Sequence, residues 1–378
     1  MTGAVAPETT ATAPQERGWR WFVLALVLMV TVTAAPGWPA ALALVAGAIR
    51  LLFPIEQFAL LVLVAIATCA VVGWWAGGRS ALALAWIVVA GWVVWKMPLA
   101  VQGYGGFVRG WALAMGAAFG LVCLATRARP FLGRSLAAVA LAGTVTMLGL
   151  AGRSADSGGS FDGARRMLSA EYGRRVDESL VAWQARTESE VWRTFSRGMP
   201  DAAERAERMA GVLAAVAEPG EGGRSGSLLV LAPALLGLES LLALSLGWAA
   251  YHRLSRVRIG PPLAALRDLR FNDQLVWGLV VGTTLLMLPT LADWRGTGAN
   301  LVCFFGTLYA LRGAGVLTWW IPDRLAVVAL LVLVILVPLL GPVLLLALSL
   351  AVTFVLGLGD TWRDFRAGAR ERRPSSLS

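Results

Sequence analysis

The sequence predicts an all-α fold, a polytopic transmembrane helix bundle of about 10 to 11 spans with an extramembrane amphipathic helical hairpin inserted in it. Of the 378 residues, 57% are hydrophobic and only 15% are charged, and the mean hydropathy is +0.68. A soluble domain carries about 25% charged residues. Apolar runs of about 20 residues recur along the chain, and one long charged stretch, 153–226, separates them into two groups.

The first group of apolar runs predicts an N-terminal transmembrane bundle over residues 21–152. Residues 1–20 are rich in Thr, Ala and Pro, and we expect a disordered tail there. The run 21–53 contains two prolines and is too long for one straight span but short for two, so it crosses once or twice. The clearer spans are Glu56–Ala76, Ser80–Leu99, Phe107–Thr126 and Phe131–Gly152.

The charged stretch 153–226 predicts a helical hairpin outside the bilayer core. Apolar residues recur at steps of three and four from Met167 to Phe195, which is one face of a helix. The sequence Met199-Pro200-Asp201 interrupts this pattern, and a second helix is expected over about 202–217.

The second group of apolar runs predicts a C-terminal transmembrane bundle over 227–360, followed by a basic tail, 361–378. The last run contains Pro338 and Pro342, so we expect two short antiparallel helices there. The loop 251–273 and the tail are both rich in arginine, which places them in the cytoplasm of a bacterium, beneath the cytoplasmic (inner) membrane. The hairpin then lies outside. The expected spans are Ser227–Tyr251, Leu275–Leu291, Ala299–Trp320 and Leu325–Leu358.

The residues that could carry catalysis are nearly absent from the sequence. There is one histidine, His252, and the three cysteines share no metal-like or disulfide-like spacing. No phosphate-binding glycine loop, zinc-protease motif or nucleophile elbow occurs. We therefore expect no enzyme, no catalytic residues, no cofactor and no metal. The net charge of +10 lies in short arginine clusters between apolar runs, which indicates contact with anionic lipid and not with nucleic acid.

Polar side chains inside the predicted spans are the candidate substrate-binding residues. Glu239 and Arg312 each lie about thirteen residues into a predicted span, and a charge at that depth costs several kcal/mol unless it is paired. The similar depths predict an ion pair between them, which either binds a solute or proton or stabilises helix packing. Asn300 lies near the start of the same span as Arg312 and completes the candidate set.

Three motifs in the second half resemble the YybS-like family of bacterial polytopic membrane proteins, a domain of unknown function. They are LRFNDQLVW at 269–277, NL at 300–301 with LYALRG at 308–313, and GLGDTWRDFR at 357–366. The resemblance covers about 228–366. Arg312 departs from it, since an uncharged polar residue is associated with that position. The family is in turn similar in hydropathy to the substrate-binding components of energy-coupling-factor transporters and to the rod-shape protein MreD.

The resemblance implies a membrane bundle that binds a small molecule or organises partners. Two functions therefore remain open. The first is a transporter-like component that binds a small solute near Glu239, Arg312 and Asn300. The second is a non-catalytic scaffold of the cell-envelope or division machinery, which binds membrane protein partners through the 153–226 hairpin. A solute site predicts polar groups that can receive a ligand, whereas a scaffold predicts an exposed apolar stripe on the hairpin.

Overall fold

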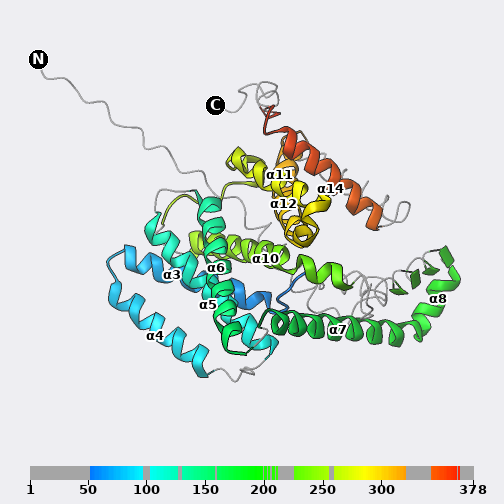
Figure 1. The fold of residues 1–378 in the computed structure, drawn as a ribbon, viewed down its shortest axis with the longest axis horizontal. Helices are drawn as coiled ribbons and strands as arrows, with labels where there is room; N and C mark the ends of the chain where they lie inside the picture. The colour runs from blue at the N-terminus through cyan, green and yellow to red at the C-terminus, as the bar shows by residue number, and fades with distance from the viewer. Residues whose placement is uncertain are drawn as a thin grey trace, which may run out of the picture.

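The structure is a computed structural model, and every regular element that it describes is a helix (Figure 1). It describes residues 52–96, 103–126, 130–157, 160–198, part of 200–211, 225–254, 259–320, 342–363 and 365–366. The all-α class is therefore confirmed for these residues. The predicted tail 1–20, the run 21–51 and most of the basic tail lie outside the described residues.

Five of the described helices are long and apolar enough to cross a membrane. These spans are Phe58–Ala76, Tyr104–Ala125, Phe131–Gly149, Leu229–Leu254 and Pro289–Trp320. Three shorter apolar stretches accompany them: Ser80–Val89, Asp273–Met287 and Ala347–Gly359. This composition is consistent with an integral membrane protein. The count of 10 to 11 spans is not confirmed, because it includes segments in 21–51 and 321–341 that lie outside the described residues.

The first group of helices packs into one apolar core. Its members are α3 (Phe58–Ala76), α4 (Ser80–Lys96), α5 (Tyr104–Ala125), α6 (Phe131–Ser157) and α10 (Ser225–Leu254). Buried side chains of α3, α5, α6 and α10 form this core, while α4 packs along α3 at the edge of the bundle (Figure 1).

Small residues allow the helices of this core to approach closely. A Cβ added at Gly116 of α5 would lie 2.7 Å from Val64 Cγ1 of α3, and one at Gly247 of α10 would lie 2.6 Å from Ala65 Cβ. Such approaches are favoured between membrane helices because packing and not the hydrophobic effect drives their association. As a result, α3 holds both α5 and α10 in place.

The second group of helices packs against the first half of α10. It consists of α11 (Val276–Met287), α12 (Arg295–Trp320) and α14 (Pro342–Gly359), with α12 between the other two (Figure 1). The predicted span Leu275–Leu291 is shorter than expected: α11 ends at Met287 because the residue before a proline disfavours the helical conformation. Leu288 is extended, with ψ 117°, and a 3-10 helix, η4 (Pro289–Trp294), leads into α12.

The charged stretch 153–226 contains α7 (Ser160–Thr187) and α8 (Glu190–Gly198), followed by helical residues between 200 and 211. The single helix expected from Met167 to Phe195 is wrong, because the chain turns at Ser189. The Ser189 hydroxyl accepts a hydrogen bond from the Trp192 N–H at 3.2 Å, which caps a new helix. The α7–α8 unit extends to one side of the bundle (Figure 1).

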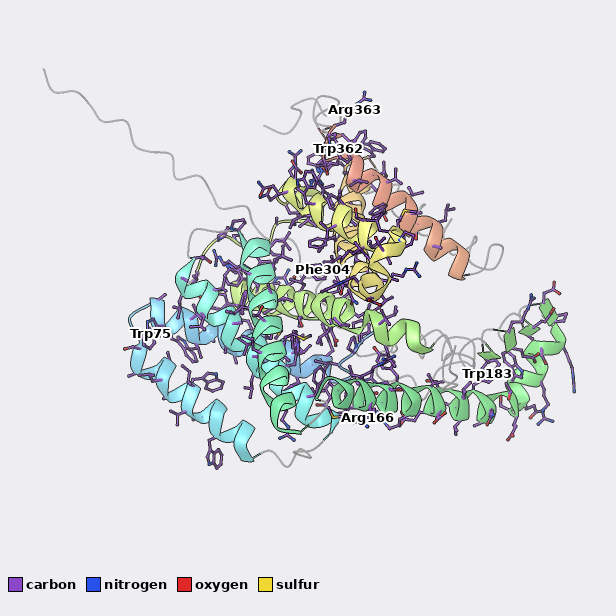
Figure 2. All side chains as sticks on the ribbon, viewed as in Figure 1. Trp75, Arg166, Trp183, Phe304, Trp362 and Arg363 are labelled. Carbon is purple, nitrogen blue, oxygen red and sulfur yellow. The ribbon has the colours of Figure 1, made fainter. Side chains whose placement is uncertain are left out.

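The α7–α8 unit has a small core of its own. Its centre is the pair Trp183 and Trp192, whose rings meet edge to face with centroids 4.9 Å apart. Figure 2 shows Trp183 at the far end of α7, well away from Phe304 between α10 and α12. Tyr172 and Val176 continue this core along α7. Most of the described apolar residues of α7 are therefore at least partly buried, by one another and by Leu229 of α10, while Val181 is 65% exposed.

Candidate functional site

Glu239 lies near the middle of α10 and is 3% exposed. Its Oε2 accepts a hydrogen bond from the Ile55 N–H at 3.0 Å, just before α3 begins. Its Oε1 is buried and has no hydrogen-bond partner among the described residues. A buried carboxylate oxygen without a partner is costly in a low-dielectric surrounding, so this atom is the first candidate for contact with a ligand.

Arg175 joins α7 to the bundle at this point. It is 1% exposed and donates to the carbonyl oxygens of Phe53 at 2.7 Å and Pro54 at 3.2 Å. It also donates to the Tyr104 hydroxyl at 2.6 Å. Its charge acts on the Glu239 carboxylate. A guanidinium can serve several acceptors at once because its donors are spread in a plane.

Tyr104 completes the contact between α5 and the segment before α3. It is the first residue of α5, because Gly103 takes φ 93°, a conformation that favours glycine, and α5 begins directly after it. The Tyr104 hydroxyl donates to the Pro54 carbonyl at 2.7 Å and accepts from the Glu56 N–H at 2.9 Å. The short segment 53–56 is thus held by α5, α7 and α10 together.

Glu171 and Arg174 extend the polar groups toward the surface of α7. Glu171 accepts from Arg175 Nε at 2.9 Å and from Arg174 at 2.6 and 3.1 Å. Arg174 is half exposed and also bonds Glu56 and Glu178. We call Glu171, Tyr104, Tyr172, Arg175 and Glu239 the Glu239 cluster.

The electrostatics of the α7 side of this cluster follow from burial and from its two arginines. Burial acts to raise the pKa of Glu171, but hydrogen bonds and charge from Arg174 and Arg175 outweigh it, and the pKa falls below its ordinary value of 4.5. Burial raises the pKa of Tyr172 to about 12, although the charge of Arg175 opposes it. The Tyr172 hydroxyl is buried and has no hydrogen-bond partner among the described residues.

The predicted ion pair between Glu239 and Arg312 is wrong. Arg312 donates from Nε to Asp360 Oδ2 at 2.9 Å and from Nη1 to Asp273 Oδ1 at 2.8 Å. We call these three residues, with Arg366, the Asp360 cluster. Glu239 and Arg312 lie at similar depths in their predicted spans, but depth alone does not show toward which neighbouring helix each side chain points. Gly237 of α10 packs against Phe304 of α12, so the level of Glu239 on α10 is close to that of Phe304 on α12. Arg312 lies about two helical turns beyond Phe304 on α12, too far along for a contact with Glu239.

The Asp360 cluster joins the end of α14 to α12 and to the arginine-rich loop. Asp360 follows α14, is 5% exposed, accepts a hydrogen bond from Arg312 and forms an ion pair with Arg366 at 3.4 Å. Arg366 also donates to the Leu269 carbonyl at 3.0 Å in the arginine-rich loop. The ion pair with Arg366 fixes the end of α14. The hydrogen bond from Arg312 joins this end to α12.

Asn300 supports the backbone of α10. Pro233 lies inside α10 and has no N–H. The Asn300 side chain donates from Nδ2 to the Val230 carbonyl at 2.5 Å and accepts from the Ala234 N–H at 2.9 Å. These two backbone groups are i and i+4 partners that a helix normally joins directly. A second Nδ2 hydrogen bond reaches the Gly296 carbonyl at 2.7 Å, so the amide is engaged on both sides.

The three predicted site residues are therefore not brought together. Glu239 belongs to one polar cluster, Arg312 to another, and Asn300 bridges the backbone next to Pro233. Sequence reasoning missed Arg175 and Glu171. Their positions in the sequence could have indicated a buried ion pair. They lie four residues apart beside Tyr172 on the apolar stripe of α7, where a charged pair needs buried partners.

The donor groups of the two clusters limit the chemistry available to them. Among the described residues, no group of three or more His, Cys, Asp or Glu side chains is placed to hold a metal ion. The Glu239 cluster offers a carboxylate oxygen and a phenol, which suit a positive charge or a hydrogen-bond donor.

No protein-family model, curated protein or solved structure matches the chain.

Proposed function

We propose that the protein is a transporter-like membrane component that binds a small polar solute at the Glu239 cluster. The observation that carries the proposal is the Oε1 atom of Glu239, a buried carboxylate oxygen with no partner among the described residues. A purely structural carboxylate would gain stability from a second partner, since an unsatisfied charged acceptor costs at least about 1–3 kcal/mol. A site that receives a ligand leaves such an acceptor available.

The surroundings of Glu239 support the same proposal. The carboxylate lies where α10 meets the segment before α3, and Arg175 of α7 closes this region from the hairpin side. Helix α7 is bound there by polar contacts, and water or a polar solute can take over such contacts when α7 opens. Opening and closing of α7 would admit a solute to Glu239 and then exclude water.

A thermal-shift screen of the detergent-purified protein tests the proposal. The compounds are vitamins, nucleobases and amino acids, and the variants are Glu239→Gln and, as a matched control, Glu178→Gln at a half-exposed carboxylate of α7. A ligand that prefers the native state raises the melting temperature by mass action. We expect a compound that stabilises the wild type and Glu178→Gln but not Glu239→Gln. A stabilising compound that acts equally on all three would place its site elsewhere.

The second candidate function is a scaffold that binds membrane protein partners through α7 and α8. The observation that favours it is the projection of this unit beyond the bundle, with a core of its own (Figure 1). The covered apolar stripe counts against it, because Trp183 and Trp192 pack on each other and not outward. Crosslinking from α8 in cells distinguishes the two, since a scaffold predicts one abundant partner.

Orientation and family are part of the same proposal. We propose a multi-pass protein of the bacterial inner membrane with the C-terminus in the cytoplasm. The hydrogen bond from Arg366 to Leu269 supports a common side for the arginine-rich loop and the tail. Membership of the YybS-like family stays a prediction, based on the motifs in the second half of the chain.

A further inference from the structure

The buried charges of the Glu239 cluster do not balance. Three charged side chains of the cluster are at least nine-tenths buried: Arg175, Glu171 and Glu239. One guanidinium thus faces two carboxylates, which leaves one negative charge. Arg174 adds a positive charge at the half-exposed edge, but it is shared among Glu171, Glu56 and Glu178. An unbalanced charge inside a membrane protein costs several kcal/mol.

Two unpartnered polar atoms lie on the side of this excess charge. They are Oε1 of Glu239 and the hydroxyl oxygen of Tyr172, in side chains that are 3% and 7% exposed. The two side chains meet the same segment: Arg175 lies over the Tyr172 ring at 5.6 Å and donates to the Pro54 carbonyl, and the next residue, Ile55, donates to Glu239. Both atoms can accept a hydrogen bond or coordinate a cation. Neither is used by the contacts that hold α7 to the bundle.

We infer that the Glu239 cluster holds one positive charge, a proton or a small monovalent cation, at Glu239 Oε1 beside the Tyr172 hydroxyl. The inference deepens the proposed function and rests on it, because it names the charge class of the ligand or coupling ion at the same site. A proton would neutralise the carboxylate by forming an O–H bond at Oε1. A cation would leave the carboxylate ionised and accept coordination from both oxygens.

The polar groups near Glu239 come from α7, α5 and the segment before α3. Helix α7 contributes Arg175, with Glu171 behind it, and Tyr172, and α5 contributes Tyr104. The segment before α3 contributes the Ile55 N–H, which donates to Oε2 and not to Oε1. Arg175 is the one cation among these groups, and it is engaged with two carbonyl oxygens, Tyr104 and Glu171. The bound charge therefore has to come from outside the cluster.

The test measures melting temperature of the full-length purified protein against pH and against added cations. The probes are NaCl, KCl and NH4Cl, with N-methylglucamine chloride keeping the ionic strength constant, and the variants are Glu239→Gln and Glu178→Gln. A glutamine at position 239 needs no positive charge. We expect the wild type and Glu178→Gln to be stabilised either by acid alone or by one of the cations. Because proton and cation share one oxygen, acid should weaken the cation's apparent affinity by up to about tenfold per pH unit.

The result that overturns the inference is a Glu239→Gln variant with the same pH and cation dependence as Glu178→Gln. If Glu239→Gln does not yield folded protein, Tyr172→Phe replaces it, since that change keeps the ring and removes only the hydroxyl. We expect Tyr172→Phe to weaken the cation's binding about tenfold, or to shift the acid response by about one pH unit. An unchanged response overturns the inference.

Measurements of proton, cation or solute flux in reconstituted vesicles distinguish binding of a positive charge at Glu239 from transport. Glu239-dependent binding of a positive charge without any flux keeps the inference and refutes transport. Flux that persists in Glu239→Gln, together with no Glu239-dependent binding, keeps transport and refutes the inference.

Discussion

The change Arg175→Met tests how α7 is attached to the bundle. Arg175 is 1% exposed and donates to Phe53, Pro54, Tyr104 and Glu171. Methionine fills a similar volume but leaves these acceptors without their donor. Removing one partner of a buried charged network typically costs about 3–5 kcal/mol. We expect the free energy of local opening of α7 to fall by this amount.

Amide hydrogen exchange of α7 peptides measures this change directly, because exchange from a local opening reports its free energy. A loss of about 3–5 kcal/mol corresponds to exchange that is faster by roughly 10² to 10⁴. Arg175→Lys keeps the charge but has no planar donor fork, so we expect an intermediate rate. The control is Arg208→Met, whose partner Glu204 is two-thirds exposed, and its effect should stay within about 1 kcal/mol. Wild-type exchange in Arg175→Met would refute the reasoning.

Three further changes test other contacts of the structure. A Cβ added at Gly313 would overlap the Thr353 carbonyl oxygen of α14, so Gly313→Ala should lower the melting temperature strongly. In the control Gly306→Ala, the added Cβ would lie 3.9 Å from its nearest neighbour and should have little effect. Equal melting temperatures for the two variants would contradict the tight crossing of α12 and α14. Asn300→Leu removes three hydrogen bonds to the backbone and should destabilise the protein by about 2–4 kcal/mol in denaturant unfolding, and a neutral effect would contradict the bridging role. The lowered pKa of Glu171 means that its contribution to α7 docking is complete above pH 4.5 and is lost as the pH falls below that value. Amide hydrogen exchange of α7, corrected for its intrinsic pH dependence, should therefore accelerate below pH 4.5 in the wild type. In Glu171→Gln it should show no such further acceleration.

The helical class and most helix positions could be predicted from the sequence because apolar runs of membrane length leave few alternatives. The end of α11 could also have been predicted, since Pro289 follows it directly. The N-cap at Ser189 carries the same kind of local signal, but the regular apolar spacing of α7 and α8 hid it.

The partners of the buried charges could not be predicted from the sequence. Depth in a span is one coordinate, and the direction of a side chain depends on which helices pack together. Gly313 and Gly357 bring α12 and α14 into close contact, and this places Arg312 next to Asp360. Nothing in the spacing of these residues indicates that the two helices are neighbours. In the same way, Arg175 lies too far from Glu239 in the sequence to be connected with it.

Asn300 illustrates a polar residue whose role depends on a distant proline. The sequence marks both Asn300 and Pro233 as unusual inside apolar spans, but only the structure shows that the amide lies between the Val230 carbonyl and the Ala234 N–H. Pro233 removes the hydrogen bond to the Leu229 carbonyl, and Asn300 supports the adjacent pair, Val230 and Ala234, in the distorted turn. The need for such support would have linked the two residues once α10 and α12 were known to be adjacent.

Infrared difference spectroscopy tests most directly whether Glu239 holds a positive charge inside the protein. Spectra of the full-length protein are compared between acidic and alkaline buffer without sodium, potassium or ammonium, for the wild type, Glu239→Gln and Glu178→Gln. We predict a protonated-carboxyl band of a buried group in the wild type and in Glu178→Gln that is absent from Glu239→Gln. Identical difference spectra for all three proteins would contradict the claim.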